Sequence, residues 1–566
     1  MTPAASDTSR GSRAVDATLA LALVAGYVAL LLGTTSDLGY ARDEGFYFQA
    51  AASYERWFEL LWRSPSEALE RAAVDRFWAA NHEHPPLMKG LFALSHALFF
   101  EKWRVFSEAG TAYRFPGMAV SALALGIVYL WGRRTAGRLA AVCAAISLGF
   151  MPRVFYHAHL DCFDVPVASM WLLTTWAYWR SLNGGGLRWA VASGVCYGLF
   201  LATKHNAWLF PGVVVAHVLV HRWRSLARGM TTGRLAVPAA LPAMLVLGPI
   251  VLWLLWPWLW FDTGARLAGW VAFHTHHDFY NMEFLGETYW KPPMPRLYAW
   301  GMTLATVPTI TLVLSGIGGA HAVRTALLPQ LARRFVALRG LARGVDPSPH
   351  SATYSLWALS ILVSYAPWLS SGTPIFGGTK HWITAYPFLC LFAAHGLRRA
   401  ADGLAAFAPA AVRRWRAVEL AVAVAVCVGP VVMALHAHPW GLSAYVPLVG
   451  GAPGAASLGL NRGFWGYQTG AMLPFVNERA PRGAQVYLHD TALASWDMLR
   501  RDGRARADLA GTLDLSRSSV GVYHHEQHMA RVEHQLWVDY GTTAPAHLGL
   551  LDGVPIVWVY VRPTPR

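Results

Sequence analysis

Long apolar runs separated by short polar segments fill the first three quarters of the chain. An apolar run of about 20 residues matches the length of an α-helix that crosses a bilayer. The pattern therefore predicts a polytopic α-helical membrane protein with about 11 transmembrane helices within residues 17–436. The predicted spans are 17–33, 113–131, 138–152, 163–180, 188–203, 207–221, 236–258, 296–320, 352–370, 381–396 and 417–436.

The basic residues between these runs predict the orientation of the chain. With residues 1–16 in the cytoplasm, every inner loop is rich in Arg, whereas the short outer loops 153–162, 204–206 and 371–380 carry one Lys or Arg each. Cytoplasmic loops of membrane proteins carry such an excess of positive charge. The arginines of the predicted inner loops are Arg133, Arg134, Arg138, Arg180, Arg188, Arg222, Arg224, Arg228, Arg234, Arg324, Arg333, Arg334, Arg339, Arg343, Arg398, Arg399, Arg413, Arg414 and Arg416.

One apolar segment does not fit this alternation. Counting 87–100 as a span would reverse every later loop. The segment follows Pro85 and Pro86 and holds about 14 apolar residues, which is short for a span. We therefore expect residues 34–112 to form one long outer loop on the membrane face, with interfacial helices.

The pattern changes after the last apolar run. Residues 440–566 hold Gly and Pro turns and mixed charge, with short strands such as 485–488 and 555–560. Between them, 471–479 and 493–501 are typical of helices. This segment predicts a soluble α/β domain, and 11 spans from an inner N-terminus place it outside the cytoplasm.

The composition agrees with a multi-pass protein, which we expect in the inner (plasma) membrane. Hydrophobic residues make up 55% of the 566 residues and charged residues only 14%, against about 25% charged in a soluble domain. The net charge of +15 comes from short basic clusters between apolar runs, which argues against nucleic-acid binding. Five cysteines, none spaced as a metal or disulfide pair, are expected to be small buried side chains.

Two adjacent carboxylates, Asp43 and Glu44, follow the first span at the outer face. Such a pair suits a general base with a neighbour that tunes its pKa. The alternative is a solvated pair of loop charges.

A second group of charges lies where other spans meet the outer face. Asp161 and Asp164 flank the start of the fourth span, and ionisable groups there are costly unless paired or hydrated. Lys204 interrupts two apolar runs, and Lys380 precedes His381 at the tenth span. All five lysines of the chain fall on the predicted outer side, and an ammonium suits a phosphate ligand.

Histidines form two further candidates. His84 stands before Pro85, where it would bind a phosphate or a metal. His274, His276 and His277 precede Asp278 in an outer loop. Since no tetrahedral ligand set of known spacing is visible, substrate contact is preferred there. No cofactor is required by the sequence, and a divalent metal stays an open alternative.

Taken in order, these features resemble one family. A single span, Asp43-Glu44, a His-Pro-Pro segment before an interfacial helix, a span ending in Gly-Arg-Arg, and an Asp-x-Pro at Asp164 are similar to protein O-mannosyltransferase-like glycosyltransferases of the GT-C superfamily. The bacterial lipid A aminoarabinose transferases are relatives. The resemblance covers residues 15–210 well, is weaker over 211–436, and is not used beyond.

The resemblance implies an enzyme that takes a sugar from a polyprenyl-phosphate donor in the bilayer. It passes this sugar to a lipid, glycan or protein acceptor on the non-cytoplasmic face, with inversion. By the same resemblance Asp43 is the base, Glu44 is its neighbour, and Asp164 is the second acidic residue, with Asp161 as a rival. The residues implied at the donor phosphate are Lys204, His84, and Lys380 or His381.

Two other functions remain alternatives. A transporter or lipid flippase needs ionisable residues at mid-membrane, but the carboxylates here gather at the outer boundaries of the spans. A scaffold that binds a partner through its outer domain would leave the interfacial acids and lysines without a role.

Overall fold

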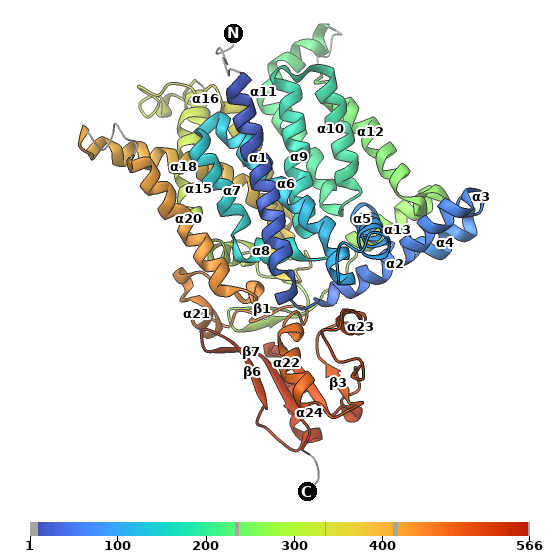
Figure 1. The fold of residues 1–566 in the computed structure, drawn as a ribbon. Helices are drawn as coiled ribbons and strands as arrows, with labels where there is room; N and C mark the ends of the chain where they lie inside the picture. The colour runs from blue at the N-terminus through green and yellow to red at the C-terminus, as the bar shows by residue number, and fades with distance from the viewer. Residues whose placement is uncertain (1–9, 233–236, 334, 411–416, 564–566) are drawn as a thin grey trace.

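The computed structural model describes residues 10–232, 237–333, 335–410 and 417–563. Among the arginines of the predicted inner loops, Arg234, Arg334, Arg413, Arg414 and Arg416 lie outside these residues, as do parts of both termini. Long helices run side by side in the upper part of Figure 1, and a sheet lies below one end of them.

Each of the 11 apolar runs coincides with helix. The corresponding helices are α1 Arg10–Thr34, α6 Ala109–Ala136, α7 Arg138–Gly149, α9 Asp164–Arg180, α10 Gly186–Leu201, α11 Phe210–Thr232, α12 Ala240–Leu255, α14 Tyr298–Thr306 with α15 Thr309–Ala322, α17 Ser351–Tyr365, α18 Tyr386–Phe407 and α20 Ala417–Ala437.

Fewer helices reach spanning length in one piece. In the described residues 4 helices are long and apolar enough to cross a membrane, or up to 5 if a bent pair counts as one span. Helices α10, α12 and α17 are 16, 16 and 15 residues long, just under the usual range of about 17–25, and α9, with 17 residues, is at its lower limit. The count of 11 spans therefore stays a prediction.

Proline interrupts two of the predicted runs. The run 138–152 ends as α7, and α8, Pro152–His159, then leaves at an angle of 66°. The run 296–320 breaks into α14 and α15 next to Pro308. The residue before a proline is pushed away from helical geometry, and Met151 and Val307 both have extended ψ angles of 122° and 132°.

The two ends of the helical bundle carry different contacts. At one end Asp16, near the start of α1, forms ion pairs of 2.8 Å with Arg133 and with Arg138, on either side of the α6–α7 turn. At the other end Thr34 bonds His159 over 2.8 Å. Helices α1 and α6 are in contact and run in opposite directions (Figure 1), as alternating spans require.

Further helices lie beside the second end. They are α2 Arg42–Arg63, α3 Pro65–Ala68, α4 Arg71–Trp78, α5 Leu87–Ser95 with a π-helical turn His96–Lys102, and α13 Thr263–Thr275. The short helix α16, Leu328–Ala332, lies at the first end, near the start of α1 (Figure 1). Helix α5 contacts α2 and α6. The expected interfacial segment 87–100 is therefore α5 and most of the π-helical turn, and it does not meet the criteria of a span. A hairpin of β1 Met282–Phe284 and β2 Glu287–Tyr289 follows α13.

The C-terminal segment folds as α/β, and the predicted strands and helices occur where expected. Its sheet has the order β4-β3-β5-β7-β6, with parallel pairs β3–β4 and β3–β5 and antiparallel pairs β5–β7 and β6–β7. The strands are β3 Gln485–Leu488, β4 Ala510–Thr512, β5 Val520–His524, β6 His547–Leu551 and β7 Val554–Val561, and the helices are α21 Gly451–Ser457, α22 Thr469–Arg479, α23 Leu493–Arg501 and α24 Ala530–Tyr540.

This segment attaches to the second end of the bundle through α23. Ser495 in α23 donates a hydrogen bond of 2.9 Å to the Ala41 carbonyl before α2. Asp502 accepts one of 2.8 Å from the Ala109 amide at the start of α6. The C-terminal segment therefore covers the place where α2 and α6 begin.

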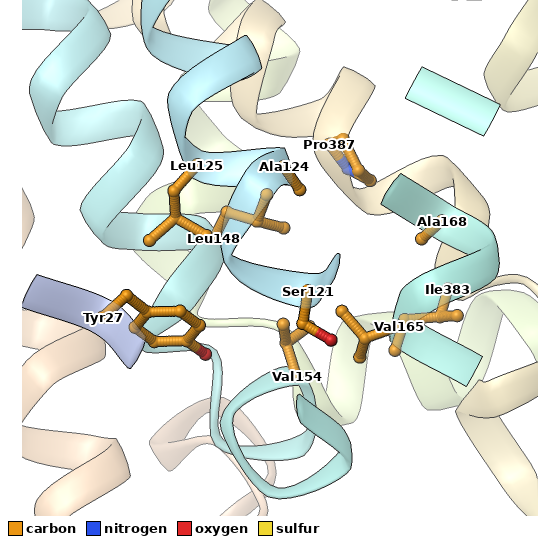
Figure 2. Close-up of a pocket in the computed structure, with 10 residues that line it drawn as sticks. All are labelled: Tyr27, Ser121, Ala124, Leu125, Leu148, Val154, Val165, Ala168, Ile383 and Pro387. Atoms are coloured by element: carbon orange, nitrogen blue, oxygen red, sulfur yellow. The ribbon is translucent and has the colours of Figure 1, made fainter. Parts of the chain in front are cut away.

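A small cavity within the bundle is apolar. Figure 2 shows it between α1, α6, α7, α8, α9 and the start of α18, with Tyr27, Leu125 and Leu148 on one side and Ala168 and Ile383 on the other. No charged side chain lines it. It belongs to the packing of the bundle, and the candidate catalytic side chains lie elsewhere.

Candidate active site

Asp43 lies in the first turn of α2, next to the C-terminal segment. Its carboxylate is 3.3 Å from the Lys380 ammonium and 3.7 Å from Arg42, and its side chain keeps 24% of its exposure. Burial raises the pKa of Asp43, but the charges of Lys380 and Arg42 outweigh it and hold this pKa below its ordinary value of 3.8. Asp43 is therefore a charged, partly accessible carboxylate at neutral pH.

Glu44 has a different environment from its neighbour. It is fully buried and accepts two hydrogen bonds of 2.7 and 2.8 Å from Arg114 in α6, in the bidentate geometry that makes such pairs strong. It also accepts the amides of Ala41 at 2.8 Å and Asp161 at 3.0 Å. Glu44 therefore ties α2 to α6 and to the loop before α9, and no face of it is open to a substrate.

Asp164 and Lys204 form a second ion pair. Asp164 begins α9, Lys204 follows α10, and the ammonium is 2.6 Å from the carboxylate. The side chains keep only 3% and 11% of their exposure. Burial lowers the pKa of Lys204, but Asp164 more than compensates and the net direction is upward. Lys204 therefore has the anionic partner that its position requires.

Asp161, the rival of Asp164, is not a partner of Lys204. Its side chain is fully buried, and neither carboxyl oxygen has a hydrogen-bond partner in the described residues. Burial, and then the charge of Glu44, raises its pKa well above the ordinary value of 3.8. This shift favours the protonated form of Asp161, whereas Asp164 is the carboxylate that pairs with Lys204.

Of Lys380 and His381, only Lys380 faces Asp43. Its ammonium lies over the ring of Trp465 at 4.2 Å from the centroid. The His381 ring turns toward the backbone of Phe376 and packs against Trp368, with 4.5 Å between ring centroids.

His84 joins two histidines that the sequence did not connect. Its ring lies 5.9 Å from that of His274, which stacks on His205 at 4.0 Å. Burial, and then the charge of Lys89, lowers the pKa of His84 well below its ordinary value of 6.5. Its ring is therefore neutral, and it would meet an anion as a hydrogen-bond donor rather than as a cation.

The histidine-rich loop gives only His274 to this cluster. His276 bonds within its own helix end, and His277 stacks on Phe376 at 4.7 Å between centroids. Within the part of the chain that the structure describes, no three His, Cys, Asp or Glu side chains are placed to hold a metal ion.

The two ion pairs are close enough to act on each other. The charge of Asp164 acts on Asp43, and that of Lys380 acts on Asp164. The structure thus brings Asp43, Lys380, Asp164 and Lys204 together from four separate segments, at the end of the bundle that the C-terminal segment covers.

The C-terminal segment adds residues that sequence reasoning missed. Asp490, after β3, forms an ion pair of 2.6 Å with Arg42, and Trp465 covers Lys380. Neither residue stands in a recognisable motif. Only the three-dimensional packing of a distant segment against α2 reveals them.

No curated protein matches the chain. Among solved structures, ArnT from Cupriavidus metallidurans bound to undecaprenyl phosphate is 17% identical over 98% of both chains, with a TM-score of 0.44. The apo state of that protein is 16% identical over 96% of this chain and 98% of its own, with a TM-score of 0.46.

An archaeal oligosaccharyltransferase, AglB from Archaeoglobus fulgidus in complex with an inhibitory peptide and a dolichol-phosphate, is 12% identical. The match covers 94% of this chain and 72% of that one, with a TM-score of 0.46. A family model, described as dolichyl-phosphate-mannose-protein mannosyltransferase, matches residues 83–256. Over this segment the chain is similar to that mannosyltransferase family, as the resemblance in its motifs implied.

Proposed function

We propose that the protein is an integral-membrane glycosyltransferase of the GT-C superfamily. It moves a sugar from a polyprenyl-phosphate donor to an acceptor on the non-cytoplasmic face, with inversion at the sugar carbon. The observation that carries this proposal is the pairing of Asp43 with Lys380 beside the pair of Asp164 with Lys204. The family match over residues 83–256 supports it.

In this mechanism Asp43 is the general base. It takes the proton from the nucleophilic group of the acceptor as that group attacks the anomeric carbon of the sugar. The bond from this carbon to the phosphate oxygen breaks at the same time, and the polyprenyl phosphate leaves with the electron pair. Since Asp43 is charged and partly exposed, it is able to accept that proton.

Cations beside the base stabilise the phosphate as it leaves. We assign this role to Lys380 and Lys204, because preorganised charge is most effective where negative charge develops. Asp164 orients Lys204. His84 and His381 belong to the same proposed donor region, with neutral His84 as a hydrogen-bond donor. Glu44 positions the loop of Asp43 through Arg114.

The topology is part of the proposal. All 11 apolar runs cross the membrane, residues 1–16 are cytoplasmic, and the C-terminal segment is extracytoplasmic. The placement of Arg133 and Arg138 beside Asp16, far along the bundle from Asp43, supports this orientation. A transporter or flippase is disfavoured because the two central ion pairs lie at one end of the helices.

Mass spectrometry of lipid-linked sugars and surface glycans, with and without the gene, tests this function. We expect a sugar-bearing polyprenyl phosphate to accumulate without the gene, and one glycan to lose that sugar. Complementation with the wild-type gene should restore both, and complementation with Asp43→Asn should restore neither. Unchanged lipid-linked sugars and glycans in the deletion strain would refute the function.

A further inference from the structure

Arg153 is a buried cation without an anionic partner. It stands in the first turn of α8, and only 2% of it is exposed. Its guanidinium lies between the rings of Tyr445 and Phe464, at 5.1 and 5.5 Å from their centroids. In the described residues it forms no ion pair, and its buried Nε and Nη2 atoms have no hydrogen-bond partner.

The other buried cations of this region have the anionic partner that Arg153 lacks. Lys380 and Lys204 each face a carboxylate, and the equally buried Arg114 binds both oxygens of Glu44. A buried charge without a partner is strongly unfavourable, and two aromatic faces compensate only part of that penalty. The arrangement around Arg153 is therefore complete only when an acceptor of hydrogen bonds is present.

Two buried donors without partners lie within reach of the charge of Arg153, and a third follows the glycine turn that contacts it. The charge of Arg153 acts on the hydroxyl groups of Tyr298 and Tyr386, and both are buried without a hydrogen-bond partner in the structure as described. The hydroxyl of Thr379 is in the same state. A group of donors that lack acceptors fits an oxyanion, whose oxygens accept several bonds at once.

The turn at Gly377 and Gly378 links Arg153 to the candidate active site. Both glycines have left-handed φ angles of +77° and +64°, which favour glycine. A Cβ at Gly378 would lie 3.3 Å from Nη1 of Arg153, and one at Gly377 would lie 2.6 Å from Cε of Lys380. Arg153 and Lys380 therefore flank one turn, and Lys380 reaches Asp43 from it.

We propose that Arg153, with the hydroxyls of Tyr298, Tyr386 and Thr379, binds a phosphate-class oxyanion beside Lys380. The proposal rests on the proposed function in that this anion takes part in sugar transfer next to Asp43. Two sources share this chemistry. One is the phosphate of the polyprenyl donor, and the other is an anionic group of the acceptor.

Melting curves and ligand titrations on the purified full-length protein test the site. The probes are undecaprenyl phosphate and, separately, inorganic phosphate and pyrophosphate. Without ligand, Arg153→Gln should melt no lower than the wild type, because the variant removes a charge that has no partner. Its Kd for at least one probe should rise about 10-fold or more, as expected for a lost charge-assisted contact. Arg153→Lys should retain part of the affinity.

Arg114→Gln is the matched control, since that arginine is equally buried but fully paired. It should melt well below the wild type without any ligand. The double variant Tyr298→Phe, Tyr386→Phe should repeat the effect of Arg153→Gln on affinity, because it removes two of the proposed donors.

The choice of ligand probe distinguishes the two possible sources of the bound anion. Weaker undecaprenyl phosphate binding by Arg153→Gln assigns the site to the donor. Normal binding of that lipid, with lost binding of inorganic phosphate or pyrophosphate, assigns it to the acceptor. The proposal is overturned if Arg153→Gln binds every probe like the wild type, whether or not it also melts lower. If the wild type binds no polyprenyl phosphate but keeps an Arg153-dependent phosphate site, the donor of the proposed function is wrong and this site stands.

Discussion

The ammonium of Lys204 donates to the Asp164 carboxylate at 2.6 Å, and both side chains are buried where α9 begins and α10 ends. This pair has a structural role whatever else it does, because removing one partner leaves an uncompensated buried charge. The proposed contact of Lys204 with the donor phosphate must therefore be tested separately from its contribution to folding.

A double variant separates these two roles. Lys204→Met alone should lower stability by about 3–5 kcal/mol, since it leaves Asp164 unpaired. Lys204→Met with Asp164→Asn should recover most of that loss, because neither member of this pair then carries a charge. If Lys204 also holds the phosphate, the double variant should still bind undecaprenyl phosphate about 10-fold more weakly or worse. Normal affinity of the double variant would limit Lys204 to the ion pair.

Glu44 should matter for folding more than for chemistry. Glu44→Gln keeps the size of the side chain but leaves Arg114 buried without its counter-charge, a loss of about 3–5 kcal/mol. We expect a clearly lower melting temperature, with turnover per folded molecule reduced far less than in Asp43→Asn. A variant of normal stability and no activity would instead place Glu44 among the reacting groups.

The pH dependence of transfer should depend on Lys380. With Lys380 present the pKa of Asp43 is lowered below its ordinary 3.8, so Asp43 stays charged and the base stays active down to acidic pH. Lys380→Met removes one of the two charges that oppose burial, and the pKa of Asp43 should rise. The acid limb of the pH–rate profile should then move to higher pH. An unmoved acid limb would show that Lys380 does not tune the base.

Cysteine labelling tests the topology. The cysteines of the chain are buried or half-buried, which favours selective labelling of introduced ones. A cysteine at Thr135, in the last turn of α6, should react only with a membrane-permeant reagent. A cysteine at Leu513, which is 62% exposed in the C-terminal segment, should react with an impermeant one. The reverse pattern would invert the proposed orientation.

Most of the helical architecture could be predicted from the sequence, because a bilayer demands long apolar runs and their ends attract charge. The breaks at Pro152 and Pro308 were harder to predict from the sequence, since a proline within an apolar run either kinks a helix or ends it. Strands β3 and β7 could be predicted from short strand-like runs between Gly and Pro turns, whereas β4, β5 and β6 were not predicted. How their sheet docks on α2 depends on contacts between distant residues, which no local pattern encodes.

The candidate site also combines residues that the sequence predicted with residues that only the structure identifies. Asp43, Asp164, Lys204 and Lys380 stood out because the chain has only five lysines, all on the predicted outer side, and because its carboxylates gather at the outer boundaries of the predicted spans. The sequence did not distinguish Asp161 from Asp164, or Lys380 from His381, because only the fold decides which side chain meets a partner. Arg153 resembled any other loop arginine, and its significance appears only when its buried Nε and Nη2 prove to have no hydrogen-bond partner among the described residues.

The role of Asp43 is the central claim, and turnover of purified Asp43→Asn tests it most directly. The substrate is the polyprenyl-phosphate sugar that accumulates in cells lacking the gene, presented with its acceptor. Asp37→Asn is the control, because that carboxylate is 53% exposed and bonds only His438 in the described residues. We expect Asp43→Asn to lose about two to four orders of magnitude in turnover per folded molecule, with Asp37→Asn near wild type. Transfer by Asp43→Asn at the wild-type rate would contradict the account.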